Sequence, residues 1–456
     1  MSTFGRFISA VFQRLVDLTD VPSPVASYLL ARNSSNTGNE WVPNNGGSPP
    51  FVMAGEWSSV IDDYSAAGVD TETVLASPAV SGNNYIYVVD NTHYSAGHGI
   101  AIVGAGTAGA DLITSVYSVS GGGRIDLNDT IVTTKSAGTT VYHDDTVAIQ
   151  NYLNEGNLSK SYLPSGLKSI VTSKLEFTKL GTQVFGPGMF GCDLYISLNE
   201  YPHLSGPYFT QTPVAIIYQR FDDDDMMFAG SNNCTLNGFV LEPHSTIEMA
   251  GYSGIAVGGV TTGEAYETYG SSGIVSSVNI LNMNLSRFWR GVTHRIAWSL
   301  TIRDTFIEGF RNYGFYMDTV APYGGGLLDN IDFRGHRLTS TISTVHGANV
   351  ESCIYIAGGD FMQYRHIHGY LSKHGFESHA DQQYMNDAYF DNLFAGYAVK
   401  LIGANKCAIS NVGHYHSSGN YYVTGNNNVL STFAAGSGAG YPSVNTGSGN
   451  KIIGVS

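Results

Sequence analysis

Three carboxylates in the second half of the chain stand at positions that could carry acid–base chemistry. They are Asp304, Glu308 and Asp332. Alternate side chains of a strand face opposite ways, so with Ile307 and Phe333 inward, Glu308 and Asp332 face outward. If the two strands are neighbours, a spacing of about 4.8 Å between strands and about 6.8 Å per two residues puts these Cβ atoms roughly 8 Å apart. That distance suits the carboxyl pair of a glycosidase, with Glu308 as acid and Asp332 or Asp304 as base or nucleophile.

Other residues of the same predicted face could bind a substrate. With Ile367 also inward, its neighbours are outward, and so is the residue three positions before it. The substrate-binding candidates are Arg334, His366, His368, Tyr364 and Trp289, and further aromatic candidates are Trp298, Tyr313, Tyr316 and Tyr323. Sugar rings can stack on such aromatic side chains.

A lyase is the alternative chemistry: His366 or His368 would remove a proton beside a uronate carboxyl that Arg334 neutralises. A solvated polar face without chemistry is also open.

A second acidic cluster follows in the sequence. Its members are Asp360, Glu377, His379, Asp381 and Asp387. Function concentrates in the loops of rigid scaffolds, so this cluster is the second candidate site, and a neighbouring subunit could complete it.

An apolar pattern predicts the element that positions these residues. Two apolar residues five positions apart recur from residue 236, as Leu236/Leu241, Ile280/Leu285, Ile302/Ile307, Leu328/Phe333, Met362/Ile367 and Tyr389/Phe394. Their first members are 44, 22, 26, 34 and 27 residues apart. Solenoid repeats have periods of about 20–50 residues, and a β-helix coil with insertions in its turns fits these spacings. The pattern predicts an all-β chain that winds into a right-handed single-stranded parallel β-helix.

The segment before this pattern resembles the start of pectate-lyase-like β-helices. It runs DDTVAIQNYLN (144–154), LPSG (163–166), SIVTSKLEF (169–177) and VFGPG (184–188). Asp144 or Asp145 could cap a helix whose apolar stripe is Ile149, Tyr152 and Leu153. A short helix over 144–154 would cover the first coil, whose apolar interior and sheet edges would otherwise be exposed.

The N-terminal part resembles phage tail proteins. LTDVPSPVASYLLARNSSNTGNEWV (18–42) is similar to the segment that ties tail fibres to the particle, and residues 98–127 resemble the region before the solenoid of phage spikes. The resemblance implies a phage tailspike or capsule depolymerase: a homotrimer, located in the virion tail, that binds a bacterial surface polysaccharide and cleaves it or only adsorbs to it. The expected domains are a particle-binding segment (1–50), a β-rich neck (51–140), the β-helix (141–430) and C-terminal coils or a cap (431–456).

Composition excludes several other functions. Net charge is −15 with 22 basic residues, so neither nucleic acid nor an anionic membrane is expected as a partner. The apolar positions within residues 4–16 are interrupted by arginines, which predicts an amphipathic helix and no signal peptide.

The four cysteines lack metal-site spacing and are expected to be buried. Asp222–Asp225 lack the ligand spacing of a calcium loop, and no cofactor or metal is expected. The run Gly104–Gly109 matches GxGxxG, but no helix pattern follows it, which disfavours a dinucleotide site.

Overall fold

The computed structural model describes residues 28–32, 39–43, 57–61, 64–154, 160–172, 175, 181–196, 234–243, 250–257, 275–294, 297–310, 312–317, 325–335, 350–359, 361–391, 396–415, 419–434 and 444–453. The chain divides into two compact units, Met1–Trp57 and Ser58–Ser456. In the first unit β1 (Tyr28–Arg32) and β2 (Asn39–Pro43) form an antiparallel hairpin. The helix predicted over residues 4–16 and the run Asp222–Asp225 lie outside the described residues.

The second unit begins with a small antiparallel sheet that has its own core. Its strands lie in the order β4-β9-β6-β7-β8-β5. They are β4 (Glu72–Val74), β5 (Tyr85–Tyr87), β6 (Gly99–Ile102), β7 (Leu112–Ser120), β8 (Arg124–Leu127) and β9 (Thr140–His143). Gly104–Gly109 lies in the β6–β7 connection with the 3-10 turn η2 (Thr107–Gly109). Because β6 and β7 are antiparallel, the motif opens no βαβ unit, as the sequence indicated.

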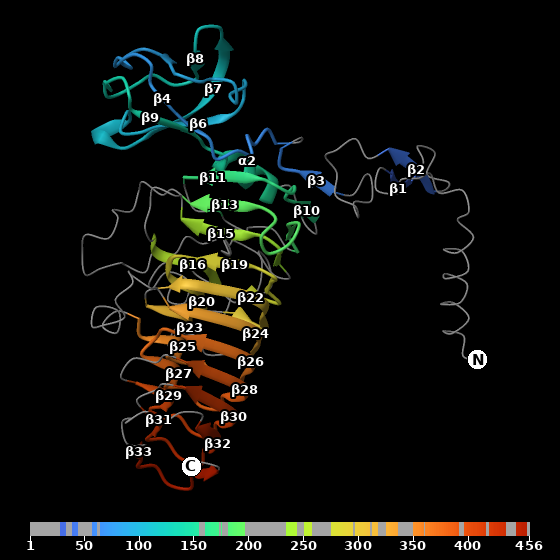
Figure 1. The fold of residues 1–456 in the computed structure, drawn as a ribbon, viewed down its shortest axis with the longest axis vertical. Helices are drawn as coiled ribbons and strands as arrows, with labels where there is room; N and C mark the ends of the chain where they lie inside the picture. Colours follow the sequence, from blue (N-terminus) through green and yellow to red (C-terminus); the bar gives the residue numbers. More distant parts are fainter. Residues whose placement is uncertain are drawn as a thin grey trace, which may run out of the picture. The chain divides into compact units, whose positions relative to one another are not determined.

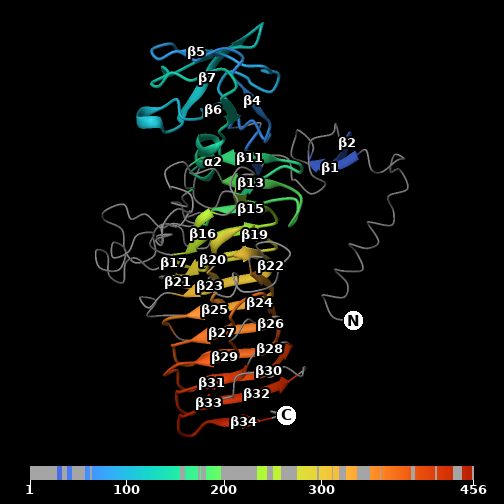
Figure 2. The same cartoon turned by 60° about the vertical axis from the view of Figure 1, so that its left-hand side comes forward.

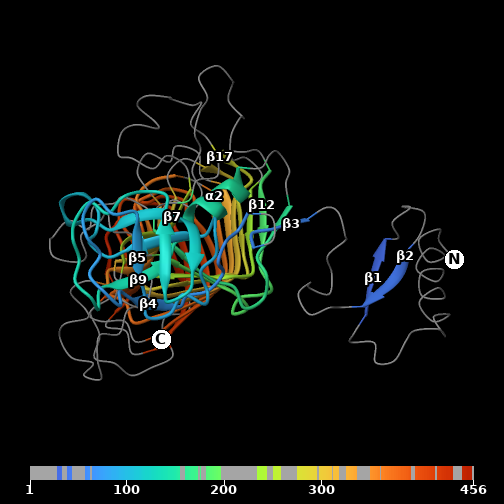
Figure 3. The ribbon, with the colours of Figure 1, turned by 90° about the horizontal axis from the view of Figure 1, so that it is seen from above.

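Helix α2 (Thr146–Leu153) follows β9 at the start of the solenoid. Its apolar residues Ile149, Tyr152 and Leu153 belong to the solenoid core, as the predicted stripe requires. The two aspartates before it serve different contacts. Asp144 Oδ1 accepts hydrogen bonds from the backbone N and the hydroxyl of Thr146, whereas Asp145 accepts the backbone N–H groups of Ala67 and Gly68 at 2.7 and 3.0 Å. Figure 3 shows the helix above the stack of strands.

Parallel strands stack as rungs through the rest of the unit, and the predicted β-helix fold is confirmed (Figure 1). Three sheets form its walls, called A, B and C here. Sheet A contains β3 (Trp57–Ser59), β10 (Lys160–Tyr162), β12 (Gln183–Phe185), β14 (Thr235–Asn237), β18 (Asn279–Leu281) and β34 (Lys451–Ile453). Sheet B contains β11 (Lys168–Val171), β13 (Asp193–Ile196), β15 (Val240–Pro243) and β19 (Asn284–Ser286). Longer strands run through A and then B: β22 (Leu300–Phe310), β24 (Gly326–Gly335), β26 (Met362–Tyr370), β28 (Tyr384–Asp391), β30 (Ala408–Tyr415) and β32 (Val429–Ala434).

Sheet C closes the coil, and Figure 2 shows its strands one above another. Its strands are β16 (Ala250–Val257), β20 (Phe288–His294), β23 (Tyr313–Met317), β25 (Ser352–Ile356), β27 (His374–Ser378), β29 (Tyr397–Leu401), β31 (Gly419–Val423) and β33 (Val444–Asn445). A further short pair is β17 (Val275–Ser276) with β21 (Ala297–Trp298). Each interior strand of these sheets pairs with the rungs before and after it, and the end strands pair on one side. The four cysteines are buried and free, as expected. No helix among the described residues is long and apolar enough to cross a membrane.

A column of left-handed residues forms the corner between sheets A and B. Its members are Gly238, Asn282, Asp304, Asn330, His366, Asp387 and Asn411, with φ between 50° and 81°. Glycine and Asn or Asp tolerate this conformation best. Polar side chains of the column bond along it: Asn330 Nδ2 donates to Asp304 Oδ1 at 2.7 Å, and Asn411 Nδ2 donates to Asp387 Oδ1 at 3.1 Å. We call this column the corner ladder.

The corner ladder changes the alternation of side chains along each long strand. Tyr364 and Ile367, three residues apart on either side of His366, both point into the core and are 0% and 2% exposed. The predicted outward position of Tyr364 is therefore wrong, because alternation was assumed to continue through the corner. The last predicted pair is wrong too: Tyr389 faces outward, and Ala388 and Phe390 face inward.

Candidate functional site

Two columns of outward side chains run over sheet B. One contains Glu242, Ser286, Glu308, Arg334, Tyr370 and Asp391, and the other contains Asn284, Phe306, Asp332, His368 and Tyr389. Inward neighbours such as Leu241, Ile307 and Phe333 are fully buried and hold these strands in register. We call this surface the sheet B face. The structure thus brings Glu308, Asp332, Arg334 and His368 together, four of the residues singled out from the sequence.

Asp332 is the most strongly held carboxylate of the face. Arg334 Nη2 lies 2.9 Å and Arg334 Nε 3.3 Å from Asp332 Oδ2, and His368 Nδ1 lies 3.8 Å from the same oxygen. Burial opposes ionisation of Asp332, but the nearby His368 and the charge and hydrogen bonds of Arg334 outweigh it and lower the pKa of the carboxyl. Asp332 is therefore suited to remain an anion and unsuited to donate a proton.

Glu308 lies one rung from Arg334 and two residues along the strand from Phe306. Asn284 Nδ2 donates to Glu308 Oε1 at 3.4 Å, and the side chain is half-buried. Register places Glu308 opposite Arg334 and Phe306 opposite Asp332. The two carboxylates are therefore diagonal neighbours with Arg334 between them, at the spacing of roughly 8 Å expected for one rung and two residues.

Glu242 is a further carboxyl of the face that the sequence reasoning missed. Burial raises the pKa of Glu242, and the charges of Asp193 and Glu308 raise it further. Arg287 lowers the pKa but does not cancel the rise. Arg287 Nη2 lies 3.2 Å from Glu242 Oε2 and also donates to the Pro243 carbonyl at 2.7 Å. The signal was present in the sequence, because Glu242 follows the inward Leu241 just as Glu308 follows Ile307.

Aromatic side chains flank these carboxylates. The Arg334 guanidinium lies 4.7 Å from the ring centroid of Phe306 and 5.5 Å from that of Tyr370. Phe190 is 71% exposed and its ring lies 6.5 Å from Phe306. Tyr389 is 38% exposed and lies 5.8 Å from His368. The sheet B face therefore combines apolar ring surfaces with charged hydrogen-bonding groups, which suits a sugar chain.

Two other predicted residues belong to the corner ladder. Asp304 pairs with Arg303 Nε at 3.1 Å and accepts the Asn330 amide. His366 Nδ1 lies 2.8 Å from Asp329 Oδ1. The apolar pairs Leu328/Phe333 and Met362/Ile367 imply that Ile367 lies beside Phe333, but Ile367 pairs with Ile331 instead. His368, and not His366, therefore stands opposite Asp332.

The predicted aromatic residues lie elsewhere. Tyr364 is buried, and its hydroxyl donates to Gln383 Oε1 at 2.9 Å, so it cannot stack on a substrate. Trp289 is half-buried on β20 of sheet C, beyond the turn at Arg287. Tyr313 and Tyr316 also belong to sheet C, where their rings stack beside Arg290. The side chain of Trp298 and the whole of Tyr323 lie outside the described residues.

The second acidic cluster is divided by the fold. Glu377 points outward from sheet C and is 6% exposed, Asp381 accepts the backbone N and side-chain amide of Asn405 in a turn, and Asp387 is in the corner ladder. Asp360 lies outside the described residues. The structure does not bring these residues to one site.

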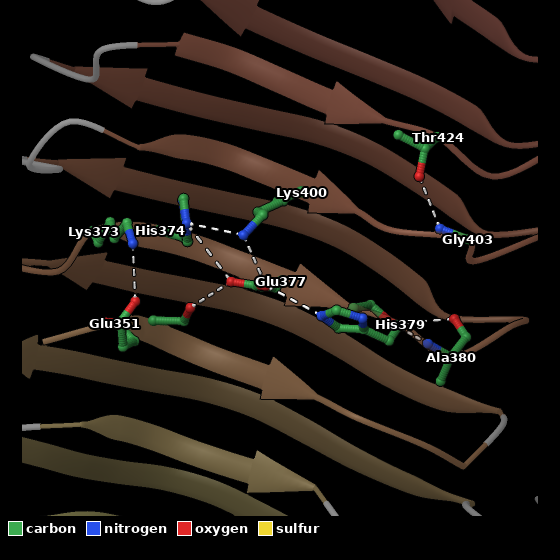
Figure 4. A network of polar contacts seen from close by, with 11 residues as sticks. Glu351, Lys373, His374, Glu377, His379, Ala380, Lys400, Gly403 and Thr424 are labelled. Atoms are coloured by element: carbon green, nitrogen blue, oxygen red, sulfur yellow. Dashed lines mark hydrogen bonds and ion pairs between the residues drawn. The ribbon is translucent and has the colours of Figure 1, made fainter. Parts of the chain in front are cut away.

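Glu377 instead lies at the centre of a polar network (Figure 4). Lys400 Nζ lies 2.9 Å and His379 Nε2 3.2 Å from Glu377 Oε1, and His374 Nε2 lies 3.7 Å from Oε2. Burial opposes ionisation of Glu377, but Lys400 and the histidines lower its pKa. Burial lowers the pKa of His374 to about 4. A neutral His374 accepts the backbone N–H of Tyr397 at Nδ1, so the network is satisfied within sheet C.

Comparisons with known proteins give likeness to solved structures alone. No protein-family model matches the chain, and no curated protein matches it. A mannuronan C-5 epimerase A-module from Azotobacter vinelandii is 12% identical with a TM-score of 0.43, over 68% of this chain and 92% of that one. The ORF18 protein of Geobacillus virus E2 is 14% identical with a TM-score of 0.41, over 68% and 59%. The enzymatically active domain of tailspike protein 2 from bacteriophage CBA120 is 12% identical with a TM-score of 0.43, over 78% and 53%.

Proposed function

We propose that this chain is a viral tailspike that binds a bacterial surface polysaccharide on the sheet B face and hydrolyses its glycosidic bonds there. The observation that carries this proposal is the alignment of Glu242, Glu308 and Asp332 on one outward face, flanked by exposed aromatic rings. Glycoside hydrolysis needs one carboxyl that carries a proton and a second that is ionised. Burial raises the pKa of Glu242, which suits it to carry the proton, and Glu308, two rungs away on the same face, is the second carboxyl.

In the proposed reaction Glu242 donates its proton to the glycosidic oxygen as the bond from that oxygen to the anomeric carbon breaks. Glu308 takes a proton from the water that attacks the anomeric carbon. The strands of Glu242 and Glu308 are two rungs apart, about 9.6 Å. This spacing favours an inverting enzyme, whose carboxyls are about 6.5–9.5 Å apart, over a retaining one at about 5–5.5 Å. Asp332 and Arg334 bind sugar hydroxyls beside the bond, and Phe306 and Tyr370 contact the rings.

The acid in this mechanism is Glu242, where the sequence alone suggested Glu308 with Asp332 as its partner. The two assignments of the acid, Glu242 and Glu308, can be distinguished because each predicts a different effect of Glu242→Gln. If Glu308 is the acid, Glu242→Gln keeps most activity. If Glu242 is the acid, Glu242→Gln loses it, and a substrate with an activated leaving group, which needs no protonation, restores the rate.

The decisive experiment incubates the purified protein with capsule and lipopolysaccharide from candidate hosts and measures reducing ends and oligosaccharides by mass spectrometry. We expect Glu242→Gln and Glu308→Gln to lower the rate about 10²-fold or more, the contribution typical of a positioned acid or base. The matched control is Asp129→Asn, an exposed carboxylate between β8 and β9 of the antiparallel sheet. If both glutamate variants cleave like the parent, the residue assignment fails. Products that absorb in the ultraviolet would indicate a lyase, and adsorption without products a receptor-binding protein.

The proposal includes assembly and attachment. Residues 18–42 resemble the particle-binding segment of tail fibres, so we propose that residues 1–50 bind a tail or baseplate protein and that the chain forms a homotrimer in the virion tail. Loss of particle binding on deletion of residues 1–50, with polysaccharide cleavage unchanged, would support this arrangement. Cleavage that disappears with the segment would contradict it.

A further inference from the structure

An open pocket of about 530 Å³ lies on sheet A, over β26, β28 and β30 and around the corner from the sheet B face. The side chains that matter here are Gln363, Arg365, His366, Tyr384, Asn386 and Ser410. None of the described residues that line it is Asp or Glu. In a chain of net charge −15 this is a pocket whose fixed charge is positive.

Arg365 supplies that charge. Its Nη2 donates to Gln363 Oε1 at 2.9 Å, and among the described residues it has no ion-pair partner. The carboxylate opposite it in the register is Asp329, whose Oδ1 lies 2.8 Å from His366 Nδ1. Asp329 is thus turned to the corner ladder, and the Arg365 guanidinium remains available to a ligand. A guanidinium binds a carboxylate through two parallel hydrogen bonds, which a lysine cannot do.

Neutral groups around Arg365 fit the rest of a sugar. Ser410 Oγ donates to Asn386 Oδ1 at 3.0 Å. The oxygen of the Asn386 side chain is therefore the acceptor in this contact, and its NH₂ group is a donor for a ligand. Gln363 accepts from Arg365 through Oε1 and keeps its own NH₂ as a donor. Tyr384 is 39% exposed and offers a ring face and a hydroxyl. Amide donors and an aromatic surface are the groups that bind hydroxyls and the apolar face of a pyranose.

We propose that this pocket binds one acidic sugar unit of the polysaccharide, with the carboxylate of that unit held by Arg365 and its ring placed against Tyr384. The inference rests on the proposed function only in naming a polysaccharide as the source of the sugar. It adds that the recognised polymer carries carboxylate groups. It also assigns recognition of that charge to sheet A, apart from the carboxyls of the sheet B face.

Saturation-transfer NMR on the full-length protein tests the pocket without any cleavage. The probes are D-glucuronate and N-acetylneuraminate, compared with D-glucose and glucose 6-phosphate. We expect transfer to an acidic sugar and little to glucose, and Arg365→Gln should weaken that binding at least tenfold. The matched control is Arg303→Gln, an exposed arginine two rungs away in the same column that pairs with Asp304. Arg365→Lys should fall between the two, because it keeps the charge and loses the paired hydrogen bonds.

Three results would overturn the inference: equal binding of glucose and the acidic sugars, unchanged binding by Arg365→Gln, or binding of glucose 6-phosphate alone. Failure of the proposed hydrolysis is a separate outcome. Glu308→Gln should lose cleavage and still bind the acidic sugar, Arg365→Gln should lose the acidic sugar, and Arg303→Gln should keep both properties. The far-ultraviolet circular dichroism of each variant checks that the β-helix is intact.

Discussion

One substitution at Arg287 should change the pKa of Glu242 on the sheet B face. The proposed acid Glu242 would act only while protonated, so we expect activity to fall as pH rises through its raised pKa. The Arg287 cation holds that pKa down against burial. Arg287→Gln should therefore shift the basic limb of the kcat/KM profile to higher pH. A limb that stays in place, or moves to lower pH, would contradict the role of Glu242.

Two buried histidines make stability fall in acid. Burial, and next the charges of His98 and His93, lower the pKa of His143 to about 3, and burial lowers that of His374 to about 4. The unfolded chain takes up protons on both near pH 6.5, which the folded chain resists. Their stabilisation is thus complete above about pH 6.5 and is lost as pH falls toward the folded values, at about 1.4 kcal/mol per pH unit for each.

His143→Phe tests this linkage, since His143 stacks on Tyr94 with centroids 4.0 Å apart and a phenyl ring can replace it there. Urea unfolding at pH 7 and pH 5 should show a smaller difference in unfolding free energy for the variant, by up to about 2 kcal/mol. An equal difference in the variant and the parent would show that His143 does not carry the effect.

The site could be predicted from the sequence only where alternation is unbroken. Glu308, Asp332 and Arg334 all lie beyond the corner, next to inward residues that the apolar pattern had identified, and they do share a face. Tyr364 lies before the corner, and the left-handed residue between it and Ile367 reverses the rule. Glu242 was within reach of the same pattern. The role of Arg365 could not be predicted from the pattern, because it depends on the contact of the Asp329 carboxylate with His366 rather than with Arg365.

At the scale of elements, the corner ladder should govern how substitutions behave. Asn330 has φ 56° and an exposed side chain. A β-branched residue is strained there, at a cost of about 1–3 kcal/mol, while glycine adopts the conformation freely. We expect Asn330→Val to be clearly less stable than Asn330→Gly in chemical unfolding. Equal losses would mean that the hydrogen bond to Asp304, missing from both variants, matters more than backbone conformation.

The network on sheet C should contribute to stability rather than catalysis. Lys400→Met leaves Glu377 ionised and largely buried without its nearest cation, which typically costs about 3 kcal/mol. Polysaccharide cleavage at a temperature where the variant is folded should be unchanged. The double variant Lys400→Met/Glu377→Met should recover part of the stability, because it removes the unpaired charge. A loss of cleavage by the folded single variant would bring sheet C into the active site.

The elements themselves were largely predictable. Repeating apolar pairs predicted stacked coils, since only a solenoid returns such pairs to one interior at intervals of 22 to 44 residues. The register of the coil that contains β26 was misplaced by two residues, because loop lengths do not say where a corner falls. Local hydrogen bonds were also beyond reach: Asp144 and Asp145 look equivalent in sequence, yet one bonds to the helix start and the other to residues 67 and 68.

For the whole molecule, assembly is the property to measure. The proposed homotrimer should elute with a mass three times the 48.8 kDa of the chain in size exclusion with light scattering. With net charge −15 per chain, the subunits repel one another at low salt, so the trimer should be no less stable at higher ionic strength. A monomer at micromolar concentration under both conditions would remove the trimer from the proposal.

The pairing of each rung with only the rungs beside it has a consequence for how such a protein can change. Because each strand is held by its pairing with the neighbouring rungs, we expect that a linking segment can change in length without a change in the register of the strands it joins. Under the proposed function, exchange of such linking segments would change which polysaccharide is bound while Glu242 and Glu308 keep their places on the sheet B face.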